Sequence, residues 1–336
     1  MNFFISIIYI FFFLPLNPVS AFDMDYGGYI KTGSLYIFDS PPLHKDFDSD
    51  LQVHLGLEGN ALNKNKWALD YEMETETSYV DGPSVQSKLR PETDFGLHRA
   101  WLRLSNDSLQ FRGGRQEILF GDGVIFKPLG LFDTRDVSGV IPQAHGVDSV
   151  RATWFSSDVS LLETWLVPAK KGTALISGIR ADLLLGEIAT GVVFQYHPKS
   201  DLDDFSGYDQ EMVQVGYHLK GEHEVGFWNE SRLDVEIEPS SPLQFDTVLG
   251  VDYTFEIGKG LHVLTEYFFS TRQREFSLSD LKGQRTYHQI GFLFDQPIDI
   301  DIKWQIFSLY DFRDRSLQLV PQVEYSITDD LFLYLH

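Results

Sequence analysis

The sequence predicts an all-β fold, an antiparallel transmembrane β-barrel of about 16 to 18 strands that follows a cleaved signal peptide. Three observations predict it: apolar and polar residues alternate along segments of about ten residues, turns recur regularly, and the N-terminus is apolar. Past the N-terminus, no stretch approaches the ~18 to 20 apolar residues that a transmembrane helix needs. Any further crossing of a membrane is therefore expected to be made by strands.

The N-terminus has the pattern of an export signal. Phe3 to Leu16 is largely apolar, and Val19-Ser20-Ala21 offers the small residues of a cleavage site. We expect cleavage after Ala21, so that residues 1–21 are the signal peptide and residues 22–336 form the barrel. No Lys or Arg precedes the apolar run, so a retained N-terminal anchor stays open as the alternative.

Composition excludes several classes of function. The chain has 336 residues, a formal net charge of −22 and no cysteine. Nucleic acid is not an expected partner, because phosphate binding needs clustered Lys and Arg. A disulfide framework, thiolate chemistry and Cys-ligated zinc are excluded.

Alternation with period two is clearest from Trp67 to Tyr79. One face carries apolar residues, whereas the other carries the acidic row Asp70, Glu72, Glu74 and Glu76. The same pattern recurs in residues 245–256 and 300–306. A soluble β-sandwich would also alternate, so the export signal and the spacing of the turns decide in favour of a barrel.

Short turns alternate with longer polar links, as in outer-membrane barrels. The short turns are expected at residues 63–66, 105–108, 156–158, 184–186, 220–222, 257–260, 296–298 and 327–330. A first strand near Tyr26 to Phe38 and a last strand at Leu331 to His336 give about seventeen strands, whereas bacterial barrels have even numbers. Either the chain is truncated before its closing strand, which the ending Leu335-His336 favours, or the barrel has about sixteen strands.

One region resembles a known family. The similarity covers Leu97 to Asp133 and rests on three groups of residues: Leu97-His98-Arg99-Ala100-Trp101-Leu102, the run Phe111 to Gly121 with Gly114-Arg115-Gln116 and Phe120-Gly121, and Pro128 with Phe132-Asp133. It resembles the alginate-export and related porin-like channels. The resemblance implies a barrel with a long loop after this strand, and an anionic polysaccharide or a small organic acid as solute. The overall acidity of the chain and the row of glutamates equally permit cations.

Arginines are expected to form a basic stripe on the inner wall, because an Arg that faces the centre of a bilayer costs about 2 to 4 kcal/mol. The candidates are Arg99, Arg103, Arg112, Arg115, Arg151 and Arg180. Arg115 has the opposite parity to Arg112 and reaches the lumen only through a bulge at Gly113-Gly114 or beyond the membrane. Together with the acidic row, the stripe either selects solutes through a transverse field or forms ordinary ion pairs.

The longest interruption, Phe120 to Ala144, is expected to fold inward and narrow the pore. Phe126, Leu129, Leu131 and Phe132 would anchor it to the wall, and Lys127, Asp133, Arg135 and Asp136 would line the constriction. The alternative is an extracellular loop, which its many apolar residues disfavour.

The function that we expect is a porin-like channel of the bacterial outer membrane for small polar or charged solutes. A structural or adhesive barrel is the first alternative, and a barrel enzyme is the second. The ten histidines lack metal-ligand spacing, and no catalytic constellation or phosphate-binding loop is present. We expect no cofactor, no metal and no catalysis; membrane lipid and a small solute are the expected partners, and the oligomeric state stays open.

Overall fold

The computed structural model describes residues 4–5, 8–13, 23–37, 47–64, 66–81, 92–132, 146–169, 174–199, 211–237, 243–271, 286–328 and 331–335. All regular structure in these ranges is β-strand. Within the same ranges, no helix is long and apolar enough to cross a membrane.

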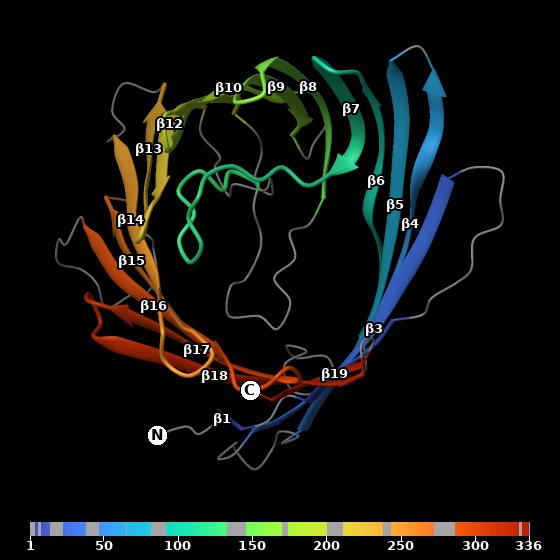
Figure 1. Ribbon diagram of the computed structural model, residues 1–336. Coiled ribbons are helices and arrows are strands. Elements are labelled where there is room, and N and C mark those ends of the chain that lie inside the picture. Colours follow the sequence, from blue (N-terminus) through green and yellow to red (C-terminus); the bar gives the residue numbers. More distant parts are fainter. Residues whose placement is uncertain are drawn as a thin grey trace.

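The strands form one sheet. Their bounds are β1 Phe4–Ile5, β2 Ile8–Phe13, β3 Asp23–Ile37, β4 Phe47–Lys64, β5 Trp67–Asp81, β6 Glu92–Ser105, β7 Leu109–Gln116, β8 Val147–Ser157, β9 Ser160–Pro168, β10 Leu175–Leu185, β11 Ile188–His197, β12 Met212–Glu222, β13 Gly226–Glu236, β14 Gln244–Phe255, β15 Leu261–Ser270, β16 Tyr287–Pro297, β17 Ile302–Asp311, β18 Ser316–Thr328 and β19 Leu331–Leu335. In this sheet, β2 to β19 are joined in chain order and β1 pairs with β3. Every neighbouring pair is antiparallel, and the sheet closes on itself as the ring in Figure 1. The predicted all-β antiparallel barrel is confirmed.

The ring closes through β2, which pairs with β19 on one side and with β3 on the other. From β3 to β19 there are seventeen strands. Because β3 and β19 are both antiparallel to β2, they run in the same direction. β1 and β2 belong to the segment predicted as a signal peptide, and its cleavage stays a prediction.

Most of the strands follow the predicted alternation. The segment from Trp67 forms β5, and the segment around Phe245 forms β14. The expectation for residues 300–306 is wrong at its start, since Ile300 is 94% exposed in the turn before β17. The Asp299 side chain accepts the backbone N–H of Ile300 at 2.9 Å, a turn-forming bond that competes with strand pairing. The predicted turn at 220–222 lies inside β12, which continues to Glu222.

The two faces of the sheet are inverted relative to a soluble protein. The outer face exposes alternate apolar side chains, for example Val192, Phe194 and Leu249. The inner wall buries a polar row, in which Gln195 accepts a bond from Trp165 at 2.9 Å and donates to Gln214 at 2.8 Å. Apolar surface outside and satisfied polar groups inside are typical of a barrel whose surroundings are lipid.

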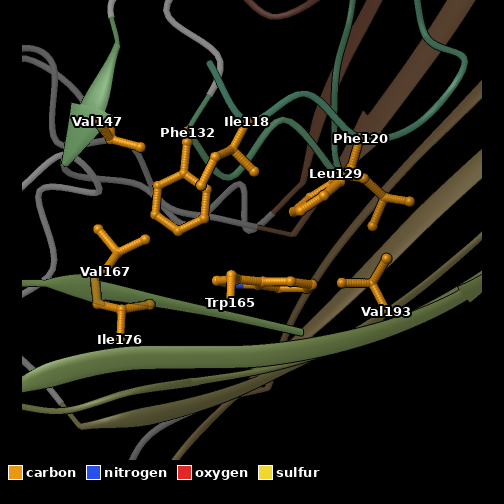
Figure 2. Packing of buried hydrophobic residues seen from close by; sticks show 9 residues of the cluster. All are labelled: Ile118, Phe120, Leu129, Phe132, Val147, Trp165, Val167, Ile176 and Val193. Carbon is orange, nitrogen blue, oxygen red and sulfur yellow. The ribbon is translucent and has the colours of Figure 1, made fainter. Parts of the chain in front are cut away.

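A hydrophobic cluster lies inside the ring, where the segment after β7 packs on the wall. Figure 2 shows its nine buried residues, Ile118, Phe120, Leu129 and Phe132 from this segment and Val147, Trp165, Val167, Ile176 and Val193 from the wall. The Trp165 ring lies beneath the segment, with its centroid 4.7 Å from that of Phe120. The cluster therefore fixes the segment against β8 to β11.

Gly178 makes room for Trp165, which gives a test of this packing. A Cβ at Gly178 would lie 2.1 Å from Cζ2 of Trp165. We expect Gly178→Ala to displace the indole and to destabilise the barrel by about 1 to 3 kcal/mol. Urea unfolding of the refolded barrel measures this difference. Gly113→Ala is the matched control, because nothing lies within 4 Å of its added Cβ; equal stability of the two variants would contradict the packing.

Candidate functional site

The segment from Glu117 to Phe132, called the interior loop below, leaves β7 and crosses the inside of the ring (Figure 1). Glu230 of β13 fixes its first part, because its carboxylate accepts backbone N–H bonds from Asp122 at 3.0 Å, from Gly123 at 2.9 Å, and from Leu129. Gly121 has φ 83°, and a Cβ there would lie 2.1 Å from Oε2 of Glu230. Glycine is required at this close approach.

Glu266 of β15 fixes the tip of the interior loop in the same way. Its carboxylate accepts backbone N–H bonds from Val124 at 2.7 Å, Ile125 at 2.8 Å and Phe126 at 2.7 Å, and a bond from Nε1 of Trp228 at 2.8 Å. Glu230 and Glu266 are both 0% exposed. Six backbone donors thus replace the water that two buried carboxylates would otherwise need.

Apolar side chains complete the attachment of the interior loop. Phe126 stacks on Phe268 of β15 with a centroid distance of 5.0 Å. Leu129 and Phe132 lie in the hydrophobic cluster, and Leu131 packs against it. The four residues named as anchors from the sequence therefore meet the wall or the cluster. Of the residues expected to line a constriction, Lys127 lies on the loop, half-buried, whereas Asp133, Arg135 and Asp136 lie outside the described residues.

A further contact joins the loop to β12. Nδ1 of His218 lies 2.7 Å from Asp122 Oδ2 on the loop, and Nε2 lies 3.2 Å from Asp182 Oδ1 on β10. One imidazole therefore bridges two carboxylates, one on the loop and one on the wall.

Three predicted arginines lie side by side on the inner wall. Strand register places Arg103 opposite Arg112 and Arg112 opposite Arg151. Arg103 binds Asp70 of β5 at 2.9 Å. The basic stripe thus begins next to the acidic row, as the sequence indicated.

The members of the stripe on either side are paired. Arg99 binds Glu72 at 3.1 Å and Glu117 of the interior loop at 2.5 Å, and its Nε lies 3.5 Å from Glu74. On the other side, Glu163 of β9 is 3% exposed and binds Arg151 at 2.7 Å and Arg180 at 3.3 Å.

Arg112 and Arg115 of β7 differ from the rest. The Arg112 guanidinium lies 4.3 Å from the centroid of the Trp101 ring. Arg115 lies on the other face of the sheet, where it binds Asp148 at 2.9 Å, since the register through Gly113 and Gly114 is unbroken. No bulge turns Arg115 inward, and its place among the lumen residues is corrected.

The remaining member of the acidic row, Glu76, meets two histidines. It lies 3.8 Å from both His54 and His98, and His54 also lies 3.4 Å from Glu74. Among the described residues, no group of three or more His, Cys, Asp or Glu is arranged to hold a metal ion.

Sequence reasoning missed the two glutamates that hold the loop. Glu230 and Glu266 are inward-facing acidic residues of β13 and β15, and each lies within a strand whose alternation is visible in the sequence. The signal in the sequence that could have identified them was an acidic residue on the inward-facing side of a strand. Which loop it binds depends on contacts more than 100 residues apart in the chain.

Solved structures with the same fold are bacterial porins. Salmonella typhi OmpF in complex with daunomycin matches with a TM-score of 0.54 and 10% identity, over 98% of this chain and 95% of that chain. A triple mutant of the Rhodopseudomonas blastica porin matches with a TM-score of 0.53 and 13% identity, over 93% of this chain and 98% of that chain. At these identities the matches show a porin-like barrel fold, and they do not show the alginate-export family. Neither a protein-family model nor a curated protein matches the sequence.

Proposed function

We propose that this chain is a porin-like channel of the bacterial outer membrane, through which small polar or charged solutes pass. The observation that supports it most is the interior loop, held inside a closed ring by Glu230 and Glu266. A loop fixed across the inside of this ring would narrow the passage that the ring encloses. The apolar outer face supplies the contact with lipid.

The charged wall supports passage of charged solutes in particular. Arg99, Arg103 and Arg112 lie beside the acidic residues of β5, so charge of both signs lines the interior. Most of these groups form ion pairs, which reduces the field that each contributes. Anionic saccharides and organic acids are the solutes that the basic side favours.

Size-limited diffusion tests this function. Liposomes that contain the refolded protein are placed in iso-osmotic solutions of sugars of increasing size, and their swelling is followed by light scattering. We expect rapid swelling in small sugars and none in large ones. An adhesive or structural barrel without a passage would give no swelling in any sugar.

A further inference from the structure

The Arg112 guanidinium lacks a partner in the described part of the chain. Its Nε is buried without a hydrogen bond, and no carboxylate lies within ion-pair distance. Each neighbouring arginine of the inner wall binds a carboxylate: Arg99 binds Glu72, Arg103 binds Asp70, and Arg151 binds Glu163. A half-buried cation without a counter-ion is costly, and an anion at this place would relieve the cost.

The stack on Trp101 orients this guanidinium. The Cζ atom of Arg112 lies 4.3 Å from the centroid of the Trp101 ring. Gly114 lies opposite Trp101 with φ 120°, and a Cβ there would lie 2.9 Å from Cα of Trp101. Stacking occupies one face of the guanidinium and leaves the terminal Nη groups without a protein partner among the described residues; a guanidinium edge can form two parallel bonds with a carboxylate.

A cavity of about 240 Å³ opens beside Arg112. Three guanidiniums line it, those of Arg99, Arg112 and Arg151, together with the two carboxylates Glu72 and Glu117. Arg99 binds both of these carboxylates, at 3.1 Å and 2.5 Å, so neither is committed to Arg112. Arg151 is paired with Glu163 at 2.7 Å, which leaves Arg112 as the guanidinium of this cavity without a carboxylate partner in the described ranges.

We infer that Arg112 binds the carboxylate of a small organic acid that carries one negative charge. Arg112 offers one uncompensated positive charge, which matches a monoanion, whereas Glu72 and Glu117 would repel the second charge of a dianion such as sulfate. Leu119 and Trp101 line the same cavity and offer apolar contact to a short carbon chain. This inference rests on the proposed function and specifies its solute class.

Propionate is the probe that tests the site. Its binding to the refolded barrel in detergent is measured by saturation-transfer NMR, with sulfate as a competitor. We expect Arg112→Gln to weaken propionate binding about tenfold or more, because a charge-assisted bidentate pair is lost. Arg112→Lys keeps the charge but loses the planar fork, so binding is expected to stay weak. Arg315→Gln, in the exposed turn before β18, controls for the loss of one positive charge.

Arg103→Gln separates a specific site from a general field, because Arg103 lies next to Arg112 but is paired with Asp70. We expect its effect on propionate binding to stay within about twofold, because Asp70 already compensates the charge of Arg103. Equal losses in Arg103→Gln and Arg112→Gln, tighter binding of sulfate, or no propionate binding by the unmodified protein would overturn the inference. A barrel that conducts ions without binding propionate contradicts the inference alone, and one that binds propionate without conducting contradicts the proposed function alone.

Discussion

Replacing Glu230 and Glu266 by Gln together is expected to release the interior loop from the wall. Each carboxylate accepts three backbone N–H bonds, whereas an amide keeps one oxygen and turns an NH2 group toward the same donors. Each replacement is expected to destabilise the folded barrel by about 3 kcal/mol, since bonds to a buried charge are lost and donors stay unpaired. No other pair of side chains binds so many backbone groups of the loop within the described residues.

The released loop is expected to move inside the passage. Single-channel recordings of the double variant should then show frequent brief changes of current, where the unmodified protein shows steady steps. Glu222→Gln is the matched control, because Glu222 is 70% exposed and binds only Lys220 among the described residues. Steady current and unchanged urea stability in the double variant would show that these carboxylates do not hold the loop.

Glu163→Gln is expected to have the second large effect, because Glu163 binds two arginines at once. Its carboxylate binds Arg151 at 2.7 Å, Arg180 at 3.3 Å and the Thr153 hydroxyl at 2.9 Å, and it is 3% exposed. Breaking a buried ion pair from one side costs about 3 to 5 kcal/mol, since the partner charge stays buried. We expect a loss of this size in urea unfolding.

The same change should alter ion selectivity. The loss of one negative charge leaves Arg151 without its carboxylate and Arg180 with Asp182 alone among the described carboxylates, at 3.5 Å, which increases the positive potential of the wall between β8 and β10. The reversal potential in a salt gradient is expected to shift toward anions, and Glu187→Gln, in the exposed turn before β11, should leave it near that of the unmodified protein. A shift toward cations, or none, would contradict the placement of Glu163 on the inner wall.

The fold could be predicted well from the sequence, because the alternation of side chains between the two faces of a strand is a local pattern that recurs in strand after strand. A side chain in a strand faces lipid or interior according to parity, so alternation around Trp67 and Phe245 located β5 and β14 without any tertiary information. Parity also identified Arg115 as the doubtful member of the basic stripe. The structure corrects its place, since the register through Gly113 and Gly114 has no bulge.

Most residues of the candidate site could be located from the sequence, but their ion-pair and hydrogen-bond partners could not. The inward parity of Arg99, Arg103 and Arg112 follows from the strand pattern, whereas the choice of Glu117 as a partner of Arg99 depends on how the loop leaves β7. Glu230 and Glu266 escaped detection because they bind backbone N–H groups, which leave no trace in residue type. The resemblance to porin-like channels indicated a long loop after β7, but it gave no indication of which residues hold that loop.

The proposed function requires that the ring enclose an aqueous passage narrowed by the interior loop. Single-channel conductance of the refolded protein in a planar bilayer tests it most directly, with heat-modifiable migration on a gel as proof of a folded barrel. We expect stable open steps, whose conductance is lower than that of an unobstructed ring of the same size. A folded, inserted barrel that gives no steps would contradict the proposed function.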